Sequence, residues 1–212
     1  MIMVGPRWRM PDGLVWWVAG SGTDRTGGGR TLTLGGNAGW DANGLTMDGS
    51  GDYATLADAN EIEPATITAC CWLKRAATGT RHSVLAKRRG TEGATPCYLG
   101  FDVRADNKIE SYAYSGSWRS TLSSGTVGTS WTHLAVVAQS NALRTYINGV
   151  ADGSTTGTFN LVANAQPFYW GYDPYEPAHY SLNGSMDGMM IFNADVSAKL
   201  NDIMRYSSGR RA

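Results

Sequence analysis

Short apolar runs alternate with clusters of Gly, Asn, Asp and Ser along nearly the whole chain. Runs of this length, rich in β-branched and aromatic residues and bounded by turn formers, predict β-strands. The most apolar run, 131–138, predicts a central strand, and Asn148-Gly149 predicts a tight hairpin after the next run. The expected strands cover 14–18, 31–34, 45–47, 53–56, 66–73, 83–86, 98–103, 108–114, 131–138, 143–147, 168–171 and 186–192.

Helical spacing of apolar residues occurs in one segment near the C-terminus. Leu200, Ile203 and Met204 recur at this spacing, and Asp195 or Ser197 can cap a helix. We expect a short helix over 197–204 that closes the sandwich as a lid. A dozen short strands without interspersed helices predict an all-β fold, a two-sheet antiparallel jelly-roll sandwich with one short C-terminal helix.

The composition fits one large domain and excludes two classes of partner. A chain of 212 residues buries enough surface to fold without a disulfide or a metal. Its 18 basic and 18 acidic residues cancel, which argues against a general nucleic-acid binder. No apolar run approaches the length of a membrane span. The first residues lack the apolar core of a secretory signal. Either the protein is not exported by that route or the signal is absent from this chain.

The three cysteines allow at most one disulfide and require none. Cys70 and Cys71 are adjacent in an expected strand, so their side chains point to opposite faces of the sheet. The sequence contains no Cys-x-x-Cys pair, and a zinc site is therefore not expected.

Seven motifs follow one another in a recognisable order. Among them are Leu45-Thr46-Met47-Asp48-Gly49-Ser50-Gly51-Asp52-Tyr53, Trp131-Thr132-His133-Leu134-Ala135-Val136-Val137 and Thr145-Tyr146-Ile147-Asn148-Gly149. The other four are segments 12–17, 20–27, 67–74 and 182–193.

In this order the motifs resemble the concanavalin A-like jelly roll, specifically its laminin-G-like (pentraxin-like) branch. The resemblance implies a jelly-roll domain over 12–206, an N-terminal arm over 1–11 and a C-terminal tail over 207–212. Members of this family bind glycans, lipids, calcium or proteins, and some are phage or viral surface proteins. The resemblance therefore implies the fold and leaves the function open.

No catalytic constellation is found in the sequence. Glucanases that share this sandwich carry three acids at alternating positions on one strand, and glycoside hydrolysis needs a pair of carboxylates. Glu61 and Glu63 are the nearest match, but Pro64 follows them and no third acid continues the pattern. We interpret them as a solvated loop pair. The histidines lack metal-ligand spacing, so no enzyme activity is expected.

Calcium is the one cofactor that the sequence leaves open, and none is required. Calcium takes carboxylate oxygens, and Asp48, Asp52 and Asp187 all lie in the matched motifs. The alternative is structural: Asp48 and Asp52 cap a turn, and Asp187 satisfies buried backbone donors. Gly188 stands where relatives usually carry a further acid.

Two aromatic clusters are candidates for binding a glycan. Tyr112, Tyr114 and Trp118 lie in or near one expected strand and its turn, and Tyr172 and Tyr175 lie in a loop rich in tyrosine. Aromatic rings stack on the apolar faces of sugars while polar neighbours supply hydrogen bonds. Tyrosine and tryptophan are also enriched at protein interfaces, so a protein contact is the alternative.

The N-terminal arm is a candidate protein contact. Arg7, Trp8 and Arg9 lie between two prolines that favour an extended path. Our first hypothesis is a non-enzymatic interaction protein on a phage virion surface, as a capsid decoration or fibre-associated protein. It would dock to virion subunits or to copies of itself. The alternative is a lectin-like, carbohydrate-binding module, in an extracellular or cell-surface location.

Overall fold

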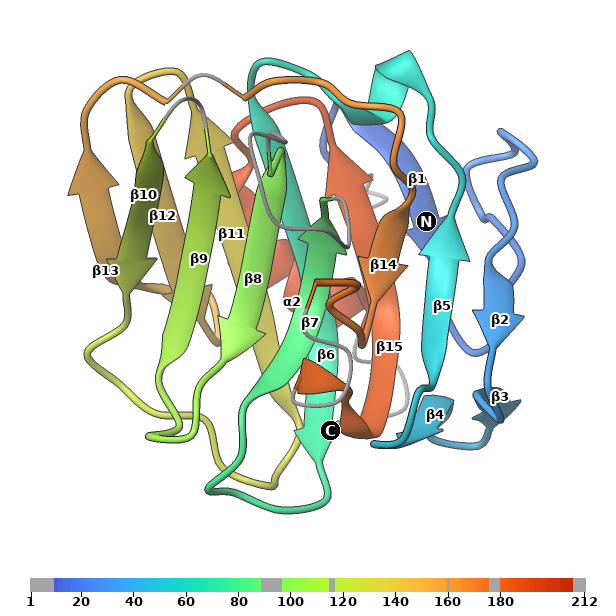
Figure 1. Ribbon diagram of the computed structural model, residues 1–212. Helices are drawn as coiled ribbons and strands as arrows, with labels where there is room; N and C mark the ends of the chain where they lie inside the picture. Colours follow the sequence, from blue (N-terminus) through green and yellow to red (C-terminus); the bar gives the residue numbers. More distant parts are fainter. Residues whose placement is uncertain (1–9, 89–96, 115–116, 160, 176–179, 208–212) are drawn as a thin grey trace, which may run out of the picture.

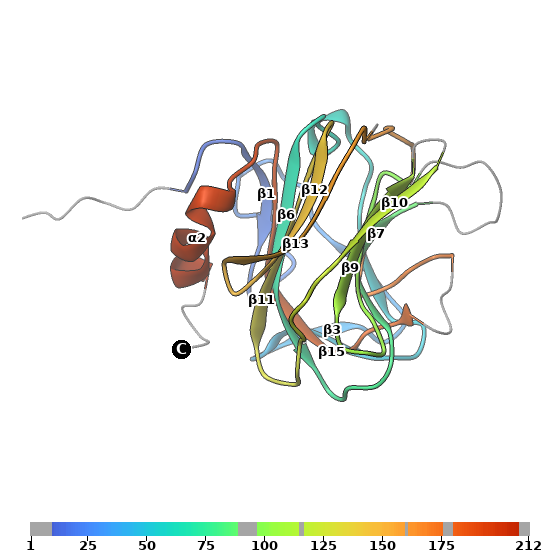
Figure 2. The same cartoon turned by 90° about the vertical axis from the view of Figure 1, so that its left-hand side faces the viewer.

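Two antiparallel sheets pack face to face, and a short helix lies on the outer side of one of them (Figures 1 and 2). The computed structural model describes residues 10–88, 97–114, 117–159, 161–175 and 180–207. Arg7, Trp8 and Arg9 lie outside these residues. The predicted all-β jelly-roll sandwich with one C-terminal helix is confirmed.

The eight-stranded sheet, here sheet A, forms the back of the molecule in Figure 1. Its order is β13-β12-β11-β6-β15-β4-β3, and β1 pairs with β15 beside this path. The strand that the sequence predicts as central, β11, lies inside the sheet between β12 and β6. The bounds are β1 Leu14–Val18, β3 Gly39–Asp41, β4 Gly44–Asp48, β6 Ile67–Arg75, β11 Thr132–Gln139, β12 Ala142–Ile147, β13 Val150–Thr156 and β15 Asn183–Phe192.

The seven-stranded sheet, sheet B, faces the viewer in Figure 1, and its order is β10-β9-β8-β7-β14-β5-β2. The 3-10 turn η1 (Asn60–Ile62) follows β5 in the chain. The bounds of the strands are β2 Thr33–Gly35, β5 Tyr53–Leu56, β7 His82–Lys87, β8 Leu99–Val103, β9 Ile109–Tyr114, β10 Trp118–Leu122 and β14 Phe168–Trp170.

Alternation along the strands of sheet B separates the core from the solvent face. On β14, Phe168 and Trp170 are buried in the core, and Tyr169 between them points outward. The Trp170 ring stacks on Trp16 of the opposite sheet, with the ring centroids 5.7 Å apart. Because successive side chains of a strand point to opposite faces, the same alternation places a row of polar and aromatic side chains on the outer face of sheet B.

A second, smaller apolar cluster lies between sheet A and the helix α2 (Leu200–Ser207). It joins Cys70, Phe192 and Leu200, whereas Cys71 packs in the main core, so the two cysteines point to opposite faces as predicted. All three cysteines are buried and unpaired. Apolar residues on both faces of sheet A make the molecule three layers thick.

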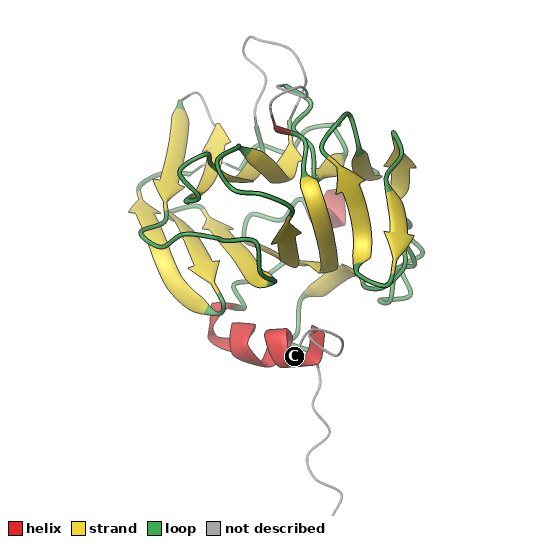
Figure 3. Ribbon diagram, turned by 90° about the horizontal axis from the view of Figure 1, so that it is seen from below, coloured by secondary structure: helices red, strands yellow, loops and turns green. Residues whose placement is uncertain are grey.

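The helix differs from the expected one in two respects. It begins at Leu200, because Ser197–Lys199 form the 3-10 turn η2. It also covers the outer face of sheet A, where the sequence predicted a lid that closes the sandwich (Figures 2 and 3). No helix of the described residues has the length and apolar character needed to cross a bilayer.

Three strands were not expected from the sequence: β3, β10 and β13. The side chains of β13 are mostly exposed, as are those of β10 apart from Thr121, and both strands lack an apolar alternation. Pairing with β9 and β12 is therefore what makes them strands. The hairpin between β12 and β13 is confirmed: Asn148 and Gly149 have φ angles of 49° and 76°, as a type I′ turn requires.

Candidate functional site

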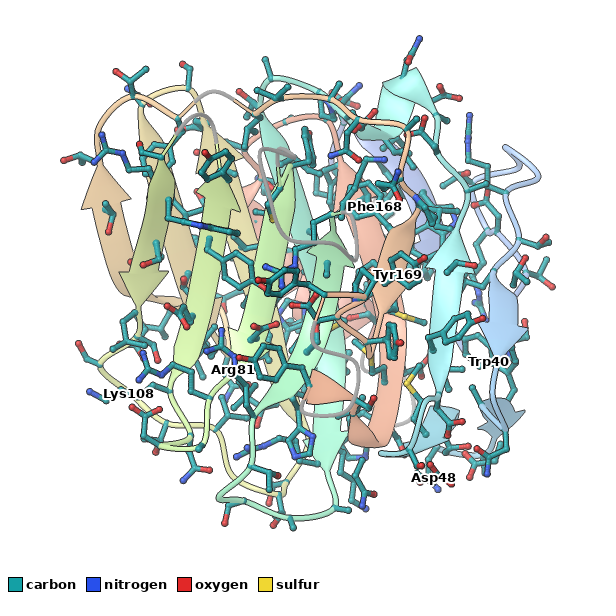
Figure 4. All side chains as sticks on the ribbon, in the orientation of Figure 1. Trp40, Asp48, Arg81, Lys108, Phe168 and Tyr169 are labelled. Carbon is teal, nitrogen blue, oxygen red and sulfur yellow. The ribbon has the colours of Figure 1, made fainter. Side chains whose placement is uncertain are left out.

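A pocket of about 270 Å³ opens on the outer face of sheet B. We call it the Trp118 pocket. Its walls come from β9, from β10 and from the chain on either side of β7 and after β14, so segments far apart in sequence meet there (Figure 4 labels Arg81 on this face). The lining residues are Arg81, Arg88, Glu110, Tyr112, Trp118, Ser120, Tyr175 and Tyr180.

The β9–β10 pair supplies the aromatic wall. Antiparallel register places Trp118 opposite Tyr114 and Ser120 opposite Tyr112, and these side chains share the outer face. The Trp118 ring centroid lies 5.2 Å from that of Tyr114 and 5.8 Å from that of Tyr112. Trp118 is 57% exposed whereas Tyr112 is buried. The indole is thus supported by tyrosines and open to solvent.

Gly100 on β8 allows Tyr112 to lie against the sheet. The two residues are cross-strand partners, and a Cβ atom at Gly100 would fall 2.1 Å from the Tyr112 ring. Any other residue at this position would displace the tyrosine. The ring therefore forms the floor of the pocket because its partner strand lacks a side chain there.

One buried carboxylate organises the pocket. Asp173 is fully buried, and its Oδ1 accepts hydrogen bonds from Arg88 Nε at 2.8 Å and from the backbone N–H of Tyr175 at 2.9 Å. Its Oδ2 accepts a hydrogen bond from the Tyr112 hydroxyl at 3.3 Å. Arg88, Tyr112 and Tyr175 are thereby fixed to one carboxylate. Because these groups are already held in place, binding a ligand costs less conformational entropy.

Arg88 fills the space between the rings. Its guanidinium carbon lies 4.3 Å from the Tyr175 ring centroid and 5.8 Å from those of Tyr112 and Trp118. Burial lowers the pKa of Arg88, but Tyr112 and Asp173 outweigh burial and the net shift of this pKa is upward. Burial also raises the pKa of the Tyr112 phenol well above its usual value. Arg88 is charged and Tyr112 neutral near neutral pH.

Arg81, like Arg88, is a charged residue that lines the pocket. Its guanidinium donates to Asp102 Oδ2 from Nε at 3.1 Å and from Nη2 at 2.7 Å, and it pairs with Glu110 at 2.8 Å. It also lies 4.7 Å from the Tyr180 ring centroid. Burial raises the pKa of Asp102 to about 6, so near neutral pH this carboxylate is ionised and holds Arg81 in place.

The structure separates the predicted aromatic residues into two groups. Tyr112, Trp118 and Tyr175 line the pocket, and Tyr114 supports Trp118 from outside it. Tyr172 instead packs against Tyr53 and Tyr169, with ring centroids 5.4 Å and 5.8 Å away.

The sequence analysis missed four residues of the pocket: Arg81, Arg88, Glu110 and Ser120. Tyr180 belongs to the tyrosine-rich segment that the sequence singled out with Tyr172 and Tyr175. Glu110 and Tyr112 are two residues apart on one strand, so their side chains point to the same face. This spacing could have identified Glu110 from the sequence. The arginines precede and follow β7 and had no local signal.

Of the predicted calcium ligands, Asp48 and Asp52 are neighbours in one turn, but they form no three-ligand cluster with Asp187. Asp52 accepts the backbone N–H of Asn37 at 2.7 Å and of Asp48 at 2.8 Å, which is the turn-capping alternative. Hydrogen bonds from Asn37 and Ser50 lower the pKa of Asp48, which lies at the lower end of the molecule in Figure 4. Asp187 lies on β15, and its side chain accepts the backbone N–H of Gly20 at 2.8 Å. The described residues contain no cluster of three metal-ligating side chains.

The two glutamates considered for hydrolysis have separate structural partners. Glu61 pairs with Arg30 and is half exposed. The Glu63 side chain is only 3% exposed, pairs with Lys87 at 3.3 Å and accepts the backbone N–H of Asn164 at 2.9 Å. The interpretation as a solvated pair is therefore correct for Glu61 and wrong for Glu63, because Lys87 requires a buried counter-charge.

Solved structures with the same fold include carbohydrate-active proteins and a toxin. A Trypanosoma rangeli sialidase in complex with 2,3-difluorosialic acid matches 94% of this chain at 15% identity and a TM-score of 0.71. The receptor-binding domain of the botulinum neurotoxin C/D mosaic serotype matches 95% at 12% identity and a TM-score of 0.71. This chain spans 33% of the sialidase chain and 53% of the toxin chain.

Domain 4 of AbnA, a GH43 extracellular arabinanase from Geobacillus stearothermophilus, was solved in complex with arabinotriose. The match covers 90% of this chain and 97% of that domain, with 19% identity and a TM-score of 0.69. At these identities the likeness concerns the fold. No curated protein sequence matches the chain.

The family comparison agrees with the motifs and with the two-sheet architecture. A model of the laminin-G type, described as the concanavalin A-like lectin/glucanases superfamily, matches residues 48–199, which is well over half of the chain. The protein therefore belongs to the concanavalin A-like lectin/glucanase superfamily.

Proposed function

We propose that this protein is a non-catalytic, lectin-like domain that binds a glycan at the Trp118 pocket. The observation that carries the proposal is the exposed indole of Trp118 beside Arg88 and Tyr175 in a pocket fixed by the buried Asp173. A solvent-exposed aromatic ring next to oriented polar groups matches both faces of a sugar: apolar C–H groups stack, and hydroxyls form hydrogen bonds.

The polar groups of the pocket suit hydroxyl recognition. Glu110 and Ser120 offer acceptors, and Arg81 offers donors. All of them project from paired strands or are held by ion pairs, so the site needs little reorganisation. Two of the similar structures were solved in complex with a sialic acid derivative and with arabinotriose, which supports a glycan by analogy of fold.

Trp118→Ala is expected to abolish glycan binding and to leave the fold intact. Trp118 is the most exposed of the aromatic residues that line the pocket. A central aromatic anchor contributes about 2 kcal/mol or more to binding, over tenfold in affinity. Its exposure limits the effect on stability to about 1 kcal/mol. Glycan-array binding, followed by calorimetry on any positive glycan, measures the first, and thermal unfolding measures the second.

The matched controls for this experiment are Trp118→Phe, which keeps a ring, and Tyr206→Ala on the α2 side of the molecule. We expect partial binding for the first and full binding for the second. A glycan array that stays blank for the wild-type protein, with and without calcium, contradicts the proposal.

We also propose, from the sequence resemblance, that the domain acts on the surface of a phage virion and docks there through protein contacts. A glycan-binding domain would suit such a surface, where it could recognise a host cell. The proposal predicts an oligomer or a stable partner. Size-exclusion chromatography with light scattering tests this prediction, and a strict monomer that captures no virion subunit contradicts it.

A further inference from the structure

A second aromatic surface lies on the same face of sheet B. Tyr53, Tyr169 and Tyr172 are half-buried, and their ring centroids lie 5.4–6.0 Å from one another. We call these three residues the tyrosine platform. Tyr53 lies flat over Gly35, its cross-strand partner: a Cβ atom at Gly35 would fall 2.1 Å from the Tyr53 ring.

The platform repeats the construction of the pocket floor, where Tyr112 lies over Gly100. In both places a tyrosine on one strand covers a glycine on the next, so the ring is held parallel to the sheet and one of its faces points away from it. In the pocket the buried Tyr112 ring is covered by Arg88 and Trp118, whereas the half-buried Tyr53 ring offers a flat surface for stacking.

A single segment connects the platform to the Trp118 pocket. Gly171 has a φ angle of 73° and turns the chain after β14. Tyr172 then packs against Tyr53 within the platform, Asp173 is buried, and Tyr175 stacks on Arg88 in the pocket. The two surfaces are therefore neighbours on one face (Figure 4, Tyr169 and Arg81).

The line from platform to pocket crosses the strands. Trp118 is on β10 and Tyr53 is on β5, and the order β10-β9-β8-β7-β14-β5 places five strand spacings between them. At about 4.8 Å per spacing the line measures roughly 24 Å. This length exceeds a single sugar ring and fits several rings in a row.

Neither surface carries an excess of positive charge. In the pocket Arg88 is paired with Asp173, and Arg81 is paired with Asp102 and Glu110. The platform consists of tyrosines, and burial raises the pKa values of Tyr169 and Tyr172, which keeps them neutral. Among the described residues of both surfaces no cation is left for the carboxylate or sulfate of an acidic sugar.

From this arrangement we infer that the ligand is a linear, uncharged oligosaccharide that lies across the strands of sheet B, with one part on the Trp118 pocket and another on the tyrosine platform. The inference rests on the proposed glycan-binding function and adds to it the length and charge of the ligand. A binder of one terminal sugar would have no use for the platform.

The test compares disaccharides with hexasaccharides of arabinan, xylan, mannan and cellulose by calorimetry. For the glycan that binds, we expect the hexasaccharide to bind at least about tenfold more tightly than the disaccharide, since added stacking contacts contribute to affinity. The double variant Tyr169→Ala/Tyr172→Ala should lose this gain and keep the affinity for the disaccharide. The retained disaccharide binding also shows that the variant is folded, and Tyr206→Ala is the matched control.

The outcomes separate the inference from the proposed function. Equal affinity for both lengths, or a hexasaccharide affinity that the double variant does not change, overturns the inference while Trp118-dependent binding still supports the function. Preference for an acidic oligosaccharide, tested with oligogalacturonides and sialyllactose, overturns it as well. If no oligosaccharide binds at all, the function and the inference fail together.

Discussion

Asp173→Ala is expected to destabilise the domain by about 3–5 kcal/mol and to abolish ligand binding, because it leaves the buried Arg88 guanidinium without a counter-charge. Asp173 is fully buried and also accepts hydrogen bonds from Tyr112 and from the backbone of Tyr175. Since a domain of this size is stable by about 5–15 kcal/mol in total, the loss is readily measured by urea denaturation.

Two further variants define the origin of the Asp173 effect. Asp106→Ala removes the carboxylate of an exposed ion pair with Arg104 at 3.6 Å and should change the stability by less than about 1 kcal/mol. Asp173→Asn keeps one oxygen, which can still accept from Arg88 and Tyr175, but it removes the charge and places an NH2 donor where Oδ2 accepts from Tyr112, so we expect an intermediate loss. If Asp173→Ala and Asp106→Ala shift the urea midpoint equally, the carboxylate does not organise the pocket.

His133 is expected to make the protein lose stability in acid. The ring is fully buried, it contacts Trp72, and neither ring nitrogen has a hydrogen-bond partner among the described residues. Burial lowers the pKa of His133 to about 3, from an ordinary value of 6.5. Between these values the unfolded chain binds a proton that the folded protein does not. Above the ordinary pKa, His133 therefore does not change the stability of the protein with pH. As the pH drops from about 6.5 toward 3, the free energy of unfolding falls by up to about 1.4 kcal/mol per pH unit.

The non-titrating variant His133→Leu tests this pH dependence. Near pH 7.5 it should be as stable as the wild type or more so, because two unpaired polar atoms are removed from an apolar site. Near pH 4.5, two units below the ordinary pKa, it should exceed the wild type by an additional 2–3 kcal/mol, about 1.4 for each unit. Urea denaturation at both pH values gives the comparison. An equal difference at the two values would mean that the His133 imidazole does not titrate in the expected window.

The fold could be predicted from the sequence to a large extent because its information is local. Alternating apolar residues and glycine-rich turns define most strands within one or two residues, as for β1 and β5. The hairpin at Asn148-Gly149 depends on two residues alone. The polar edge strands β10 and β13 escaped prediction because their backbone hydrogen bonds to a neighbour, and not their own side chains, make them strands.

The candidate site could be predicted only in part. Aromatic enrichment pointed to Tyr112, Trp118 and Tyr175, which line one pocket, and also to Tyr172, which belongs to the adjacent platform. The acidic residues of the turn and of β15 were suitable calcium ligands by type. In the structure backbone N–H groups donate to all three. The donors to Asp48 and Asp52 come from their own turn, and the donor to Asp187 on β15 is the distant Gly20.

The sequence by itself determined the class of fold, the position of most strands and the kinds of side chain available for binding, since these follow from patterns within a few residues. Only the tertiary structure decided which of those side chains meet. Arg88 and Asp173 are 85 residues apart in the chain, and Tyr53 and Tyr172 come from different strands and loops. Their contacts depend on the order of the strands in sheet B, which is set by long-range pairing and core packing and leaves no mark in the local pattern of the chain.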